Sequence, residues 1–186
     1  MQIESKKIIL RKMIVADIDD VIYWNSEATE WMNWDAPWER DEDEAYDWEA
    51  YRKRKLEEII TNKEEDSLQM SLEVCINNEE QTHIGGVACY FINDEYRIDE
   101  KGKKIAIGMV INEEKYRGYG YGKESFLTYI HYLQSLGYEE IYTQTWSGNI
   151  PMIKMAENLG FKECNRYVDL REVRGKRYDG LTFVMK

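Results

Sequence analysis

Stretches of apolar residues alternate with polar turns along the chain, and their spacing predicts seven strands and four helices. Three apolar, β-branched stretches follow one another in the middle of the chain, as in an antiparallel meander. The predicted strands span residues 7–13, 68–76, 82–92, 104–111, 140–146, 161–172 and 177–185. The predicted helices begin at Asp17, as an N-cap, and near Asp41, Gly122 and Asn149; the second runs to about Thr61, the third to Leu136 and the fourth to Gly160.

The third helix connects the strands 104–111 and 140–146, so these two strands are expected to be parallel. The remaining strands are expected to pair with antiparallel neighbours. The fold class is therefore α+β, with a mixed, mostly antiparallel sheet of about seven strands and about four helices. No repeat, linker or low-complexity segment divides the chain, so we expect one domain over residues 1–186.

The net charge of the chain limits the classes of partner that it is expected to bind. The formal net charge is -11 and the pI about 4.8, which argues against a nucleic-acid partner because phosphate binding needs basic surface. An acidic field suits a cationic substrate such as an amine, although acidity also maintains solubility. No apolar run reaches membrane-span length and no signal-peptide pattern is present, so we expect a cytoplasmic protein without membrane contact.

Cysteines and histidines give no metal-site spacing. The three cysteines are widely separated within apolar runs, which predicts buried free thiols in a reducing compartment: Cys75, Cys89 and Cys164. The two histidines, His83 and His131, are far apart, so no metal is expected.

A Gly-rich turn, residues 117–122, separates an apolar strand from an amphipathic helix. Its three glycines allow close approach of a ligand to the backbone and positive φ angles. Their N–H groups and the helix N-terminus predict an anion site, flanked by Arg117 and Lys123. Glu124 after Lys123 excludes a Walker P-loop, and Lys123 occupies the position of the third glycine in a dinucleotide-binding fingerprint.

The spacing Arg117-x-x-Gly120-x-Gly122 resembles the R/Q-x-x-G-x-G/A signature of the GNAT superfamily of N-acetyltransferases. Residues 149–161 resemble the second cofactor segment of that family, in which an asparagine opens a helix that ends in Leu-Gly-Phe. Ala156 and the closing residues 175–185 are similar to the RimJ/RimL-like branch. A tyrosine that protonates the departing thiolate in many GNAT enzymes is absent, because Ala156 stands in its place.

The resemblance implies an acetyl-CoA site, in which a splayed strand holds the pantetheine arm and the Gly-rich turn holds the pyrophosphate. Asn149, which opens the second cofactor segment, is expected to reach the arm or a water near the thioester. A backbone N–H at Met109 or Val110 is expected to polarise the acetyl carbonyl. The implied cofactor-binding residues are Met109, Val110, Ile111, Arg117, Gly118, Tyr119, Gly120, Tyr121, Gly122, Lys123 and Asn149.

The sequence says less about the residues that would bind and activate the acceptor. The family's glutamate before the strand glycine is Ala106 here, and a serine often found in the branch is Met152. Glu30 and Asp35 are the remaining candidates for a general base, although a solvated carboxylate is the ordinary role of each. Trp31 and Trp34 lie in an aromatic segment, residues 27–38, which we expect to be irregular and to form one side of the acceptor pocket, with some tryptophans packed in the core.

These residues predict an N-acetyltransferase that moves the acetyl group from acetyl-CoA to a primary amine by direct attack. The acceptor is a small molecule or a protein N-terminus, and the protein a monomer or a homodimer. Two alternatives remain open: an aminoglycoside or polyamine acetyltransferase, which the acidity and the tryptophans favour, and a catalytically silent acyl-CoA-binding module.

Overall fold

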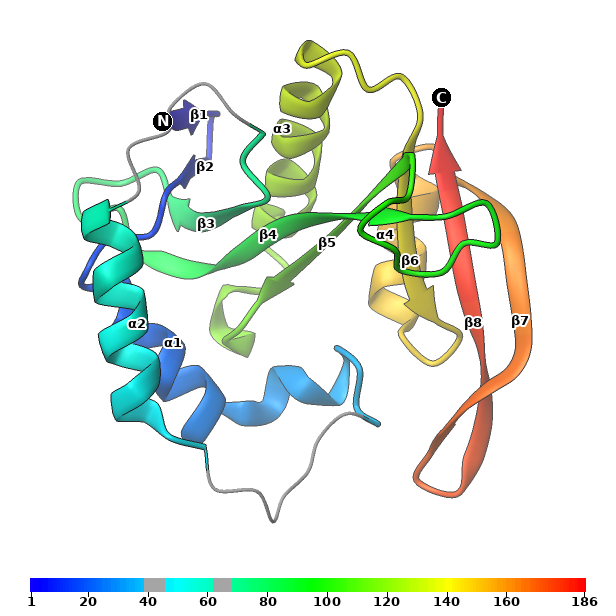
Figure 1. Ribbon diagram of the computed structural model, residues 1–186, viewed down its shortest axis with the longest axis horizontal. Coiled ribbons are helices and arrows are strands. Elements are labelled where there is room, and N and C mark those ends of the chain that lie inside the picture. The colour runs from blue at the N-terminus through cyan, green and yellow to red at the C-terminus, as the bar shows by residue number, and fades with distance from the viewer. Residues whose placement is uncertain (39–45, 62–67) are drawn as a thin grey trace.

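The computed structural model describes residues 1–38, 46–61 and 68–186, and these form one sheet with helices on both faces (Figure 1). The eight strands of the described residues are ordered β1-β2-β3-β4-β5-β6-β8-β7. Their bounds are β1 Gln2–Glu4, β2 Ile8–Arg11, β3 Ser71–Ile76, β4 His83–Ile92, β5 Lys104–Ile111, β6 Ile141–Trp146, β7 Lys162–Val173 and β8 Lys176–Met185.

The topology confirms the α+β fold class. Only β5 and β6 pair in parallel, and the other neighbouring strands of the described sheet are antiparallel. The expected strand number of seven is one too low, because β1 was missed. This strand has three residues, with only Ile3 half-buried between exposed neighbours, so it carries no apolar stretch that a pattern could detect.

Helices of the described residues lie on opposite faces of the sheet. They are α1 Asp17–Ser26, α2 Trp48–Thr61, α3 Tyr121–Ser135 and α4 Ile150–Asn158, with short 3-10 helices η1 Thr29–Asn33 and η2 Glu114–Tyr116. The main core lies between the sheet and the α3 and α4 face, where Leu10, Val74 and Ile84 pack with Phe126 of α3. Their strand neighbours Arg11, Cys75 and His83 point to the other face, which α1 covers, because successive side chains alternate across a strand.

Helix ends follow the expected signals at α3 and α4. The helix α3 ends at Ser135, and Gly137 follows with a φ of 94°. Asn149 caps α4 through its side chain, and Gly160 follows that helix with a φ of 92°. The expected start of α2 near Asp41 lies outside the described residues; within them the helix runs from Trp48 to Thr61.

Three local expectations were wrong. Asp17 is not an N-cap: the N-cap position is Ala16, without a side-chain hydrogen bond, and Asp17 is the first helical residue. Its carboxylate is buried against Arg11 instead, at 2.6 Å. Cys164 is exposed rather than buried, while Cys75 and Cys89 are buried as expected. The aromatic segment is not entirely irregular, since it contains η1.

Among the described residues, no helix combines the length and apolar character that crossing a bilayer requires.

Candidate functional site

The parallel strands β5 and β6 separate part of the way along (Figure 1). Their pairing ends at Ile107 and Thr143, where Thr143 Oγ1 donates a hydrogen bond of 2.8 Å to the Ile107 carbonyl. Beyond this point β5 continues to Ile111 and β6 to Trp146. The end of β5 therefore has one edge without a paired strand, as the predicted splay requires.

Backbone alternation decides which residues of β5 face this open edge. Asn112 N–H donates to Ile84 O at 3.1 Å, so the main-chain N–H of Asn112 faces β4. Main-chain groups of successive residues point to opposite edges of a strand, so Val110 also faces β4. Met109 and Ile111 face the open edge, and the Ile111 carbonyl already accepts a hydrogen bond of 3.0 Å from Arg117 Nε. Of the two backbone N–H groups expected to polarise a carbonyl, the geometry favours Met109 over Val110.

The Gly-rich turn connects η2 to α3 with a left-handed backbone at two positions. Gly118 and Gly120 both have a φ of 84°, which residues with a Cβ rarely adopt. Gly122 lies inside α3, and its φ is not positive, contrary to the expectation for all three glycines. A Cβ at Gly122 would lie 3.5 Å from Met109 Cε, so the turn packs directly against the end of β5.

The first turn of α3 presents free backbone donors. Glu124 N–H bonds to Gly120 O at 3.0 Å and is the first amide of the helix with a helical acceptor. The preceding amides of Tyr121, Gly122 and Lys123 have none, as at any helix N-terminus. Gly120 occupies the N-cap position without a side chain that could accept from them. These amides and the positive end of the helix dipole suit an anion.

Arg117 does not extend freely over these amides. Its Nε and Nη2 donate to the carbonyls of Ile111 and Asn112, at 3.0 and 2.8 Å. Its Nη1 contacts Glu30 Oε2 at 2.6 Å. The side chain therefore fixes the end of β5 and the aromatic segment next to the Gly-rich turn, whereas Lys123 is exposed.

Glu30 is held by two donors. Its second oxygen accepts from Trp34 Nε1 at 2.9 Å, in addition to the ion pair with Arg117. Slight burial raises the pKa of this carboxyl, but the hydrogen bonds from Trp34 and Arg117 lower the pKa by more than burial raises it. The net pKa therefore lies below its ordinary value. These contacts weaken the case for Glu30 as a general base, because an efficient base has a pKa raised toward the working pH and that of Glu30 is lowered.

The main chain of Trp34 connects the aromatic segment to the second cofactor segment. Its carbonyl accepts from Trp146 Nε1 at 2.8 Å and from Asn149 Nδ2 at 3.0 Å. Trp34 as a whole residue is 38% exposed. Trp31 is half-buried, and its Nε1 donates to the Trp24 carbonyl at 2.9 Å, a structural contact.

Asn149 uses both ends of its amide. The Oδ1 atom accepts from Met152 N–H at 3.2 Å and so caps α4, while Nδ2 contacts the aromatic segment. Its expected contact with the pantetheine arm stays a prediction. Asp35, the other candidate base, is exposed in the same segment.

A shallow cleft of about 430 Å³ lies between the start of the aromatic segment and the residues that follow β5. Residues 27–30 form one side and residues 112–115 the other. The lining contains four carboxylates, from Glu27, Glu30, Glu113 and Glu114, and one cation, from Lys115. Glu113 pairs with Lys115 at 2.7 Å and Glu30 with Arg117 at 2.6 Å, so the lining keeps a net negative charge from the other two carboxylates, which favours positively charged molecules.

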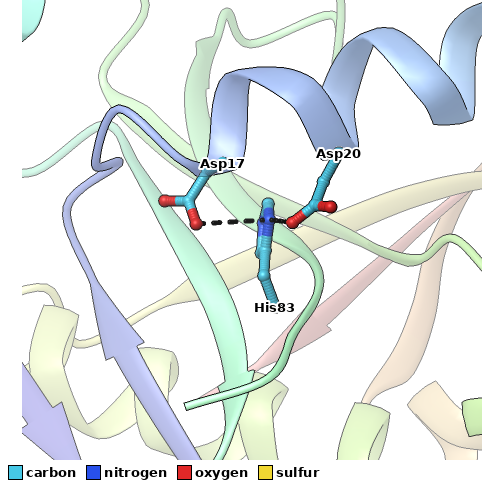
Figure 2. A group of neighbouring side chains, drawn as sticks. All are labelled: Asp17, Asp20 and His83. Atoms are coloured by element: carbon cyan, nitrogen blue, oxygen red, sulfur yellow. Dashed lines mark hydrogen bonds and ion pairs between the residues drawn. The ribbon is translucent and has the colours of Figure 1, made fainter. Parts of the chain in front are cut away.

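A buried ion cluster under α1 was not apparent from sequence. Figure 2 shows His83 of β4 between Asp17 and Asp20 of α1, with Nδ1 3.5 Å from Asp17 Oδ1 and 3.0 Å from Asp20 Oδ2. On the other side, Nε2 is 2.9 Å from Glu73 Oε2 and 3.2 Å from Gly85 O. Both ring nitrogens thus face acceptors only, which requires a doubly protonated imidazolium.

The side chains of Asp17, Asp20 and His83 have the spacing of metal ligands. Asp17, however, also accepts two hydrogen bonds from Arg11, at 2.6 and 2.9 Å. The imidazolium and the guanidinium offset two of the three carboxylates, and the third, Asp20, is half-exposed to water, so ion pairing and solvent account for the cluster.

Comparison with known proteins places this geometry in a family. Residues 7–162 match the model of the acetyltransferase (GNAT) domain. A curated relative, an SPbeta prophage-derived uncharacterized N-acetyltransferase, YokL, of Bacillus subtilis (strain 168), is 34% identical over 73 residues. That match covers 39% of this chain and 41% of the relative, so the aligned part spans less than half of either protein.

Solved structures agree in fold over nearly the whole chain. A GNAT-family acetyltransferase from Bacillus anthracis is 17% identical with a TM-score of 0.71, covering 100% of this chain and 98% of that one. RimL, a ribosomal-protein alpha-N-acetyltransferase in complex with coenzyme A, is 14% identical with a TM-score of 0.70, covering 100% and 97%. Because the family model spans residues 7–162, most of the chain, the chain belongs to the acetyltransferase (GNAT) family.

Proposed function

We propose that this protein transfers the acetyl group of acetyl-CoA to a primary amine. The observation that carries the proposal is the continuity between two sets of backbone donors. The open edge of β5 at Met109 and the free amides that begin α3 are neighbours, because Gly122 packs on the Met109 side chain. A long ligand with an amide-bearing arm at one end and phosphates at the other fits this arrangement.

The assignment of residues to the two ends follows from their geometry. Met109 and Ile111 would hold the pantetheine arm by strand-like hydrogen bonds. The amides of residues 118–123 would bind the pyrophosphate, as helix N-termini bind phosphates elsewhere. Arg117 would act by holding the end of β5 and Glu30 in place rather than by contacting phosphate, since its donors already have partners.

The chemical step needs little beyond alignment. The amine nitrogen attacks the acetyl carbonyl carbon, the carbon–sulfur bond breaks, and CoA leaves as the thiolate while the nitrogen loses a proton to water. Met109 N–H would stabilise the developing oxyanion. Holding the two reactants in register supplies up to about 7–11 kcal/mol of the barrier reduction. An amine that arrives neutral requires no strong base. This agrees with the contacts of Glu30, whose two oxygens already accept hydrogen bonds from Trp34 and Arg117.

For the acceptor, the likeness in fold to RimL supports a RimJ/RimL-like enzyme that acts on a protein N-terminus or a small amine. The cleft lined by four glutamates favours a second candidate, a polycationic acceptor such as a polyamine or an aminoglycoside. Trp34 would contact the acceptor through its exposed ring.

The test combines binding and turnover. Acetyl-CoA should raise the Tm of the protein, and a panel of N-terminal peptides, polyamines and aminoglycosides should identify acceptors by release of free thiol. Absence of a thermal shift would refute the cofactor assignment. A shift without thiol release from any acceptor would favour a silent acyl-CoA-binding module over an enzyme.

A further inference from the structure

The turn between β1 and β2 is fixed against the first turn of α3. Lys7 N–H and Ser5 Oγ both donate to Glu124 Oε1, each at 2.6 Å. On the other side, Asn77 N–H donates to the Lys7 carbonyl at 2.8 Å. Lys7 is therefore held at both main-chain polar groups, so the direction in which its side chain leaves the backbone is set by the fold.

The side chain of Lys7 reaches the Gly-rich turn. Its Nζ donates to the Tyr119 carbonyl at 2.9 Å. It also lies 3.3 Å from the position that a Cβ on Gly120 would occupy. The ammonium group thus lies beside the residue that caps α3, next to the free amides of that helix.

Within the part of the chain that the structure describes, no carboxylate neutralises the charge of this ammonium group. Tyr119 O is a neutral acceptor, and the ion pairs found among the described residues do not include Lys7. Glu124, the nearest carboxylate in these contacts, accepts from the Lys7 amide and from Ser5 rather than from Nζ. An ammonium group has three donors, so two remain available for a ligand.

Arg117, the cation that the sequence motif places at this turn, is occupied by Glu30 and two carbonyls. We propose that Lys7 supplies positive charge that the occupied Arg117 does not offer, in addition to the exposed Lys123, and donates a hydrogen bond to the pyrophosphate of acetyl-CoA bound at the Gly-rich turn. This inference rests on the proposed function and adds to it a phosphate-binding residue, Lys7, from a distant part of the sequence. In a chain with a net charge of -11, a local cation at the phosphate site also offsets long-range repulsion of the anionic ligand.

The experiment measures the Kd of CoA and of 3′-dephospho-CoA by calorimetry for the wild type, Lys7→Met and Lys7→Arg. Lys6→Met is the matched control, because Lys6 is the exposed neighbour in the same turn and carries the same charge. Loss of one charge-assisted hydrogen bond predicts about tenfold weaker binding for Lys7→Met. Lys6→Met should change the Kd less than about twofold, and Lys7→Arg should retain most of the affinity.

Comparison of the two ligands locates the contact. An equal loss with CoA and 3′-dephospho-CoA supports a pyrophosphate contact. A loss seen only with CoA would move the contact to the 3′-phosphate and overturn the assignment. Equal Kd values for Lys7→Met and Lys6→Met would also overturn it while leaving the proposed function intact. Failure of the wild type to bind either ligand would instead refute the proposed function itself.

Discussion

The guanidinium group of Arg117 lies 2.6 Å from the carboxylate of Glu30, 87 residues earlier in the chain. This ion pair joins the Gly-rich turn to the aromatic segment, and the Trp34 carbonyl joins the same segment to Trp146 and Asn149. The proposed cofactor side and acceptor side are therefore connected through one short stretch of chain. Changes in that stretch can be designed to separate binding of the two substrates.

Replacement of Glu30 by Gln tests whether this residue is a base. Glutamine keeps one carbonyl oxygen that can accept from Trp34 or Arg117, its NH2 group replaces the second acceptor, and it cannot take a proton. We expect kcat to stay within about threefold of wild type, whereas loss of a general base costs about 100-fold or more. The pH profile of kcat/KM provides the check, and loss of its acidic limb in Glu30→Gln would reinstate Glu30 as the base. Because the ion pair is partly exposed, stability should change by less than about 1 kcal/mol.

Truncation of Trp34 tests the acceptor contact. The hydrogen bonds from Trp146 and Asn149 end on the Trp34 carbonyl, so Trp34→Ala keeps them. We expect the acceptor KM to rise about tenfold or more, the loss of one stacked aromatic contact, with the Kd of acetyl-CoA unchanged. Trp34→Phe keeps a ring but removes the Nε1 bond to Glu30, and it should remain close to wild type. A parallel loss of acetyl-CoA binding in Trp34→Ala would show that the ring supports the fold.

The charge requirement at the Gly-rich turn can be isolated with a matched pair, Gly120→Asp and Gly120→Asn. Asp and Asn side chains both tolerate a left-handed backbone and differ little in shape, so the two variants should have the same backbone strain at φ 84°. Only Asp adds a negative charge, which would also pair with Lys7 Nζ nearby. We expect acetyl-CoA to bind Gly120→Asp about tenfold more weakly than Gly120→Asn at low salt, with a smaller difference at high salt. Equal affinities would contradict an anion site at this turn.

The cluster around His83 predicts a pH-dependent stability. Burial lowers the pKa of His83, but the hydrogen bond and charge of Glu73, with Asp17 and Asp20, raise it more, so the net pKa lies above its ordinary value of 6.5. A raised pKa stabilises the folded state below that ordinary value. This stabilisation is lost as pH rises through the pKa of the folded protein.

His83→Gln measures this contribution. At about pH 6 the variant should lose about 1–3 kcal/mol of the free energy of unfolding, because it leaves the mostly buried Glu73 carboxylate without its cation, while Asp17 keeps Arg11. The loss should shrink as the pH rises above 6.5 and through the raised pKa of the folded protein, where the wild-type imidazole becomes neutral. Urea denaturation of both proteins over this range is the measurement. A difference that stays constant with pH would indicate that His83 contributes packing against Trp24 rather than charge.

The elements with strong local signals were predictable. The strand β5 coincides with its predicted range of 104–111, since its apolar stretch ends at polar residues on both sides. The helix α4 starts after Asn149 because the asparagine side chain accepts from the third following amide, a preference that sequence shows directly. The spacing of the Gly-rich turn likewise indicated the family that the comparison found.

The remaining features depend on contacts between distant residues. Lys7 and Gly120 meet only because β2 lies under α3, and nothing in the sequence near either residue indicates it. The same holds for His83 and Asp17, whose pairing depends on α1 crossing the sheet. Asp17 resembled a cap because both roles use a carboxylate before an apolar helix face, and burial next to Arg11 decided between them.

The main-chain attachment of Trp34 has a practical consequence. A carbonyl group is present whichever amino acid occupies the position, so Trp146 and Asn149 would retain their acceptor after any substitution there. Residue 34 is thus a favourable position for a saturation library aimed at new acceptor preferences. Selection there would vary the chemistry offered to the acceptor on a scaffold that stays constant.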